Sequence, residues 1–175
     1  MVPLREGGTG SASEEPRQPE FMPDRFEPGS HNAIGIAGLS EGVAWVIEQT
    51  VEQLHENELD LVRTFIDGVD RIDGLTYFGP QGVRDRVGVF SVRVEGFDPH
   101  ELSAVLETSY GILTRPGIHC APLAHEALGT ASTGGTTRFS FGPFTTLQDV
   151  QYASESLAQI AAEGAKTHLP ATAQS

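Results

Sequence analysis

The chain has 175 residues and a formal net charge of −13, because 24 acidic residues outweigh 11 basic ones. This charge disfavours contact with nucleic-acid phosphates, which needs clustered Lys and Arg, and it disfavours binding to anionic membranes. Hydrophobic residues make up 38% of the chain, which is ordinary for a globular domain, and Lys166 is the only lysine.

The first 30 residues are expected to be irregular. Residues 7–13 are rich in Gly and Ser, which indicates a flexible loop with accessible main-chain amides. Four prolines between positions 16 and 28 then favour an extended arm. Such a loop can bind an anion through its amides, but Gly-rich loops are common and the residues alone indicate this only weakly.

A long helical stretch follows the arm. Ser30 and Asn32 are good helix N-caps, and apolar residues then recur at three- and four-residue steps from Ile36 to Leu54. A second apolar run, from Leu59 to Ile72, continues or restarts this amphipathic helix. The polar residues 55–58 between the two runs are the expected break.

The periodicity changes to two at Leu75, which predicts strands. In residues 136–141 the side chains of Thr137, Phe139 and Phe141 are expected on one face. We expect strands at 75–78, 87–94, 112–115 and 136–141, and helices at 99–107, 123–128 and 147 to about 162. Short loops between alternating helices and strands predict an α/β (α+β) domain, with a mostly antiparallel sheet and helices packed on one side.

The densest candidate site is Arg-Pro-Gly-Ile-His-Cys-Ala-Pro, residues 115–122. A cysteine reacts through its thiolate, which nearby cations stabilise, and Arg115 and His119 flank Cys120. The alternative is a small buried cysteine in a turn. A zinc site made of His119, Cys120 and His125 has poor spacing and only one thiol, and is disfavoured. One cysteine forms no internal disulfide, and no apolar segment indicates a signal or a membrane span, so a reducing, cytoplasmic setting is expected.

Arg138 is a cation in the middle of a largely apolar strand. A guanidinium there can bind a carboxylate through two hydrogen bonds. The alternative, which the strand by itself favours, is an arginine that reaches solvent from the polar face.

Five segments resemble, in order, the class V aminotransferase family, and within it the cysteine desulfurases and selenocysteine lyases. They are residues 7–11 (Gly-Gly-Thr-Gly-Ser), 22–32 (Met-Pro-Asp-Arg-Phe-Glu-Pro-Gly-Ser-His-Asn), 35–39 (Gly-Ile-Ala-Gly-Leu), 115–122, and 137–146 (Thr-Arg-Phe-Ser-Phe-Gly-Pro-Phe-Thr-Thr). The resemblance implies the C-terminal domain of a fold-type I, pyridoxal-phosphate-dependent, homodimeric enzyme that acts on a small-molecule amino-acid substrate. Ile118 departs from many desulfurases, which have a second histidine there.

The resemblance also implies roles for individual residues. Cys120 would attack the substrate sulfur and become a persulfide while alanine is released. Arg138 would hold the substrate carboxylate, with Arg115 and His119 beside it. The implied contacts to the pyridoxal phosphate are Gly8, Thr9, Gly10, Ser11, Ser30 and Asn32.

The lysine that binds the cofactor covalently precedes the Gly-rich loop in the family, and Lys166 lies at the wrong end of the chain to replace it. We therefore expect residues 1–30 to be an arm and loop of the large domain, 31–165 the small domain, and 166–175 a tail. The chain would be inactive alone and would act with a large domain or a full-length relative. The alternatives are a non-catalytic interaction module, a sulfur carrier that serves an acceptor protein, or a class V aminotransferase with another substrate.

Overall fold

The computed structural model describes residues 1–12 and 14–167. The chain divides into two compact units, of which the first is Met1–Thr50 and the second begins at Val51. The predicted domain boundary after residue 30 refers to the domains of the family and stays a prediction. Among the described residues no helix is both long and apolar enough to cross a membrane.

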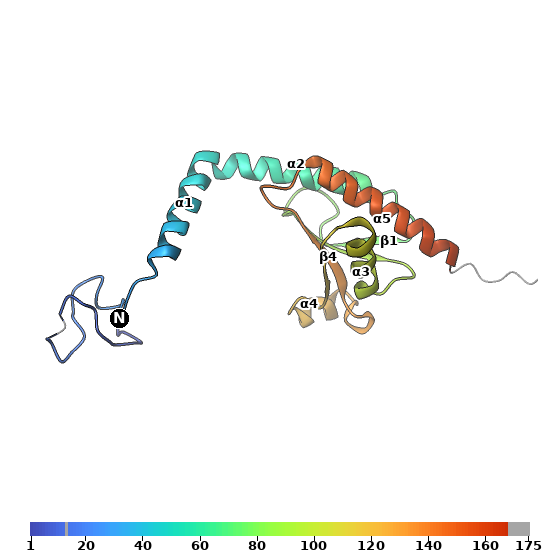
Figure 1. Cartoon of the computed structure of the whole chain (residues 1–175). Coiled ribbons are helices and arrows are strands. Elements are labelled where there is room, and N and C mark those ends of the chain that lie inside the picture. The colour runs from blue at the N-terminus through green and yellow to red at the C-terminus, as the bar shows by residue number, and fades with distance from the viewer. Residues whose placement is uncertain (13, 168–175) are drawn as a thin grey trace, which may run out of the picture. The chain divides into compact units, whose positions relative to one another are not determined.

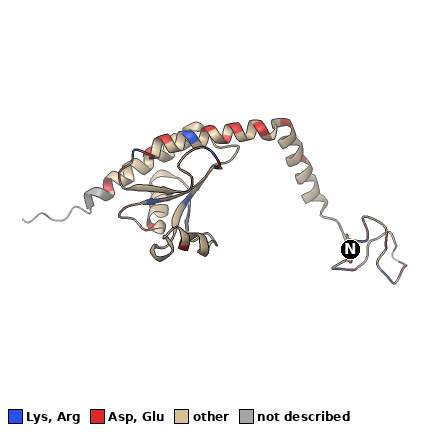
Figure 2. Ribbon diagram, turned by 180° about the vertical axis from the view of Figure 1, so that it is seen from behind, with Lys and Arg blue, Asp and Glu red and all other residues tan. Residues whose placement is uncertain are grey.

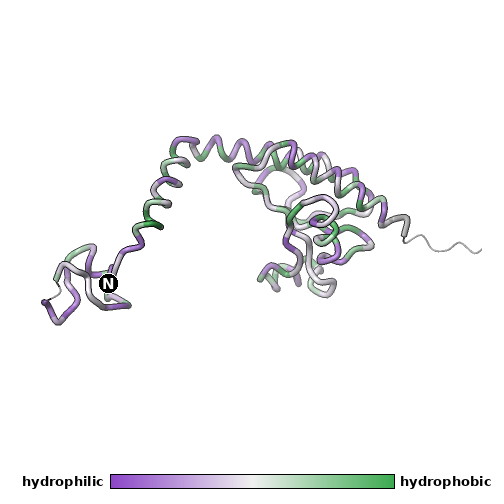
Figure 3. Tube along the Cα trace, in the orientation of Figure 1, coloured by the Kyte–Doolittle hydropathy of each residue, from purple (hydrophilic) through white to green (hydrophobic). Residues whose placement is uncertain are grey.

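The first unit consists of an irregular segment and one helix, α1 (Ala33–Gln49). The described part of residues 1–30 forms no helix or strand, as expected. Asn32 is the N-cap, because its Oδ1 accepts a hydrogen bond from the Gly35 amide at 3.0 Å. No residue of α1 is buried, although the helix carries many apolar side chains (Figure 3). The exposed ones include Ile34, Ile36, Leu39, Val43 and Ile47.

The break between the two helical runs lies at Thr50 and not at residues 55–58. Thr50 has φ 62°, which no α-helix accommodates, and α2 (Val51–Val69) begins directly after it. The polar residues 55–58 form an exposed turn within α2, where His55 Nδ1 lies 3.8 Å from Glu58 Oε2. Polarity alone is compatible with a solvent-facing helical turn, so it did not mark the break.

The second unit contains a four-stranded sheet in the order β1 (Leu75–Phe78), β2 (Val89–Val94), β4 (Thr136–Ser140), β3 (Arg115–Gly117). Every neighbouring pair is antiparallel, which confirms the predicted sheet. The strand expected at 112–115 is wrong, because the Ile112 amide donates to the Leu106 carbonyl at 2.9 Å and so closes the preceding helix. β3 therefore begins at Arg115.

Three long helices cover one face of this sheet, which confirms the predicted layering: α2, α3 (Pro99–Tyr110) and α5 (Leu147–Thr167). α2 and α5 lie side by side (Figure 1). The predicted apolar face of α5 is buried, with Val150 and Leu157 fully inaccessible. Two shorter elements, α4 (Pro122–Ala127) and the 3₁₀ helix η1 (Ala131–Thr133), lie between β3 and β4.

The centre of the core is a cluster of aromatic rings. Phe65 of α2 lies with its ring centroid 4.5 Å from that of Phe90 and 5.6 Å from that of Phe139. Phe139 and Thr137 are buried on this face, as the two-residue period predicted. The sheet therefore directs Arg138, which lies between them in the sequence, to the opposite face.

We predict that Phe65→Ala lowers the free energy of unfolding of the second unit by about 3–5 kcal/mol, because the side chain is 0% exposed and its removal leaves a cavity. Urea denaturation followed by circular dichroism measures this. The matched control is Phe144→Ala, whose ring is 81% exposed, with an expected loss below about 1 kcal/mol. Equal losses in the two variants would contradict this account of the core.

Candidate functional site

Cys120 lies on a tight turn between β3 and α4. His119 and Cys120 have φ of 56° and 59°, a left-handed backbone that few residues other than glycine adopt. Two hydrogen bonds close the turn: His119 Nε2 donates to the Arg115 carbonyl at 2.7 Å, and the Ala121 amide donates to the Ile118 carbonyl at 3.0 Å. Cys120 is exposed, so the alternative of a buried structural cysteine is wrong. Consecutive strained residues at an exposed thiol are typical of a functional loop.

Two arginines face this turn. Arg115 and Arg138 are direct cross-strand partners in the β3–β4 ladder, so both side chains leave the same face of the sheet. Arg115 Nη2 lies 3.9 Å from Cys120 Sγ. Like charges directly opposite each other are unfavourable unless an anion lies between them. The pair therefore favours a negatively charged group at this face, either a thiolate or a bound carboxylate.

Arg138 carries an unsatisfied donor. Its Nε is buried and has no hydrogen-bond partner within the described part of the chain. Leaving a buried donor unpaired costs free energy, and the donors of a charged group cost the most. The alternative of an arginine that reaches solvent from the polar face does not explain this buried Nε. A carboxylate that accepts from the guanidinium would satisfy it.

The surroundings of His119 lower its pKa and so favour the neutral form of the ring. Burial is the largest cause of the lowered pKa, and the positive charges of Arg138, His125 and Arg115 lower it further. The hydrogen bond to the Arg115 carbonyl raises the pKa and so opposes these effects. Since a carbonyl only accepts, Nε2 carries the proton in this hydrogen bond. In the neutral ring Nδ1 is therefore unprotonated and able to accept a proton.

A second histidine lies behind His119. His125 of α4 is 4% exposed, and its ring centroid is 5.7 Å from that of His119. Its Nδ1 forms a hydrogen bond of 2.7 Å with Thr130 Oγ1. The sequence singled out His125 only for the disfavoured zinc site, and among the described residues no group of three His, Cys, Asp or Glu could hold a metal.

The residues expected to contact a phosphate lie in the first unit. The Gly29 amide donates to the Gly8 carbonyl at 2.6 Å, which brings the Gly-rich loop next to Ser30. Thr9 Oγ1 and Ser11 Oγ are 3.1 Å apart, and Ser11 also donates to the carboxylate of Asp24. These hydroxyl groups and the amides around Gly10 can donate hydrogen bonds to a phosphate, although the Ser11 hydroxyl already donates to Asp24. The Asn32 side chain is engaged as the N-cap of α1.

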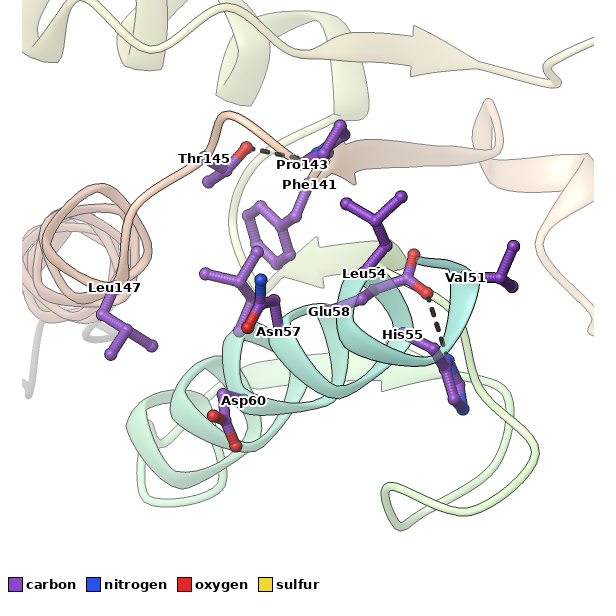
Figure 4. A pocket seen from close by; sticks show the side chains of 12 residues that line it. Val51, Leu54, His55, Asn57, Glu58, Asp60, Phe141, Pro143, Thr145 and Leu147 are labelled. Atoms are coloured by element: carbon purple, nitrogen blue, oxygen red, sulfur yellow. Dashed lines mark hydrogen bonds and ion pairs between the residues drawn. The ribbon is translucent and has the colours of Figure 1, made fainter. Parts of the chain in front are cut away.

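A cavity of about 610 Å³ lies elsewhere in the second unit, between α2 and the segment that joins β4 to α5. Figure 4 shows Phe141 and Thr145 on one side of it and Leu54, Asn57 and Glu58 of α2 on the other. None of the site residues expected from the sequence lines it. Glu52, Glu56 and Asp67 of α2 are exposed, as expected for a solvated helix face, and Figure 2 colours the acidic residues red. Glu58 departs from this expectation, because its carboxylate accepts a hydrogen bond from the Gly88 amide at 2.9 Å.

Comparison with known proteins places these features in a family. Residues 1–153 match the family described as aminotransferase class-V. A probable cysteine desulfurase of Methanothermobacter thermautotrophicus is 31% identical over 167 residues, which are 94% of this chain and 41% of the relative. One from Pyrococcus abyssi is 30% identical over 129 residues, covering 74% of this chain and 31% of the relative.

Solved structures agree on the fold. The apo cysteine desulfurase of Thermococcus onnurineus has a TM-score of 0.72 and 28% identity, over 81% of this chain and 34% of that protein. The cysteine desulfurase CsdA of Escherichia coli has a TM-score of 0.70 and 23% identity, over 97% and 40%. The chain thus spans less than half the length of these relatives.

Proposed function

The chain belongs to the class V aminotransferase family, and from this premise we propose that it is the substrate-facing part of a pyridoxal-phosphate-dependent cysteine desulfurase. One observation carries the proposal: the buried Arg138 Nε, which has no hydrogen-bond partner among the described residues, lies opposite Arg115 in the sheet and near an exposed cysteine on a strained turn. That arrangement offers a carboxylate site and a nucleophile on the same face of the sheet. An amino acid with a sulfur side chain needs both.

Arg138 binds the substrate carboxylate in this proposal. The bound carboxylate satisfies the buried Nε and separates the positive charges of Arg138 and Arg115. The fixed guanidinium orients the substrate because a planar fork accepts a carboxylate in one geometry. Binding energy at this end of the substrate thereby positions its sulfur relative to Cys120.

Cys120 is the proposed nucleophile. Its thiolate attacks the substrate sulfur, an S–S bond forms, the carbon–sulfur bond breaks, and the carbon skeleton takes up a proton and leaves as alanine. The guanidinium of Arg115, 3.9 Å from Sγ, stabilises the thiolate. His119 Nδ1 accepts the thiol proton, since the lowered pKa of His119 keeps its ring neutral near pH 7.

The cofactor supplies the electron sink that makes the carbon–sulfur bond cleavable. Thr9, Ser11 and the main chain around Gly8 and Gly10 would hold its phosphate together with Ser30. The exposed apolar side chains of α1 support packing against a large domain, because a helix with this many apolar residues and none buried is costly in water. That domain would also supply the lysine that binds the cofactor covalently.

A polypeptide of these 175 residues is expected to bind no pyridoxal phosphate covalently and to release no alanine from cysteine. Its one lysine is Lys166, in the last turn of α5. Borohydride reduction followed by mass spectrometry measures covalent attachment, and Lys166→Ala is the control, expected to behave like the unchanged chain. Attachment of the cofactor together with alanine release would contradict this prediction.

The proposed activity itself is tested by combining the chain with a lysine-bearing large domain of the family and adding cysteine and the cofactor. Alanine release that needs both polypeptides supports the proposal. Uptake of sulfur by Cys120 from another desulfurase, without alanine release by the combined protein, would instead make the chain a sulfur carrier and overturn the catalytic proposal.

A further inference from the structure

We propose that His125 is a positioning residue: its buried ring supports the ring of His119 and thereby holds the Cys120 turn in its reactive shape. This inference deepens the proposed function, on which it rests for the role of Cys120.

The orientation of His125 is fixed at one end by Thr130. His125 is 4% exposed, Thr130 is 2% exposed, and His125 Nδ1 and Thr130 Oγ1 are 2.7 Å apart. The Thr130 amide also donates to the His125 carbonyl at 2.8 Å, so His125 is bonded to Thr130 through both its main chain and its side chain. A buried side chain with this hydrogen bond has one preferred rotamer. His125 is therefore a rigid support.

The other side of His125 contacts the Cys120 turn. Its ring centroid lies 5.7 Å from that of His119, at an interplanar angle of 49°. His119 in turn donates from Nε2 to the Arg115 carbonyl, which closes residues 115–119 into a loop. Since His119 and Cys120 both have left-handed backbone, the turn needs contacts from outside to persist. The described contacts of the His119 ring that can supply this are the Arg115 carbonyl and His125.

His119 lies among positively charged side chains. Burial is the main cause of its lowered pKa, and the charges of Arg138 of β4, His125 and Arg115 of β3 lower it further. In the proposal His125 acts through its ring, which packs near that of His119, and its hydrogen bond to Thr130 fixes the orientation of the ring.

The experiment uses the 175-residue protein without cofactor or substrate and compares His125→Ala with His125→Phe. Histidine NMR titration reads the pKa of His119, and iodoacetamide alkylation at a fixed pH reads the reactivity of Cys120. His125→Ala is expected to raise the pKa of His119 towards its ordinary value and to slow alkylation by roughly threefold, because the opened turn moves Sγ away from Arg115. Access contributes little to this rate, since Cys120 is already exposed.

His125→Phe keeps a ring of similar size and is expected to preserve most of both properties. His55→Ala, at an exposed histidine of α2, is the matched control and should change neither. Circular dichroism checks that each variant is folded, and the Phe variant keeps the test valid if the Ala variant is not. The inference is overturned if His125→Ala leaves the His119 pKa and the alkylation rate unchanged, or if the Phe variant loses as much as the Ala variant. Neither readout needs sulfur transfer, so failure of the proposed function is recognised separately, by the absence of alanine release.

Discussion

Cys120→Ala is expected to abolish sulfur transfer in an enzyme assembled from this chain and a lysine-bearing large domain. Cys120 is the only cysteine in the sequence, so no neighbouring thiol of this chain can replace it. The substitution removes an exposed side chain and should change the free energy of unfolding by less than about 1 kcal/mol. Sulfide and alanine release from cysteine measure the effect.

The control for this prediction is Leu123→Ala, at an exposed residue of the adjacent helix α4. This variant should release sulfide and alanine at the parent rate, and that result would show that a surface change near the turn is tolerated. An unchanged rate in Cys120→Ala would remove Cys120 from the mechanism. A lost rate in both variants would point to damage of the loop and not to the thiol.

The second large effect is expected for Arg138→Met. Loss of a two-point guanidinium–carboxylate contact should lower kcat/KM for cysteine by roughly 30- to 1,000-fold, which corresponds to about 2–4 kcal/mol. The same variant should be at least as stable as the parent, because it removes a buried donor that has no partner in the described part of the chain. Steady-state kinetics and urea denaturation measure the two effects.

Arg93→Met is the matched control for Arg138. Arg93 lies on β2 two residues from Ser91, the cross-strand partner of Arg138, so it leaves the same face of the sheet, but it donates to Thr133 Oγ1 at 2.6 Å and therefore has a partner. We expect kcat/KM to stay within about threefold of the parent in this variant. A larger loss in Arg93→Met than in Arg138→Met would contradict the assignment of the carboxylate site.

Much of the second unit could be predicted from the sequence because its signals are local. The alternation of residues 136–141 gave the buried face of β4, and the spacing of Val150, Leu157 and Ile160 gave the buried face of α5. The break at Thr50 could not be predicted in this way, since threonine is ordinary in helices and its positive φ is a property of the fold.

In the candidate site, too, local features could be predicted and long-range ones could not. The motif of residues 115–122 marked the Cys120 segment in the sequence, and the exposure of Cys120 agrees with a functional loop. The pairing of Arg115 with Arg138 depends on strand register, which one sequence does not reveal, and the start of β3 was predicted three residues too early. The two rings of His119 and His125 come together because the chain turns at His119 and Cys120, which have left-handed backbone. The sequence shows only that a second histidine follows His119 six positions later.

The most direct test of the account is the mass of the peptide that contains Cys120, after the assembled enzyme has reacted with cysteine in the absence of a sulfur acceptor. The account predicts that this peptide gains the mass of one sulfur atom, in an amount equal to the alanine released. Alanine release with an unmodified Cys120 would contradict it.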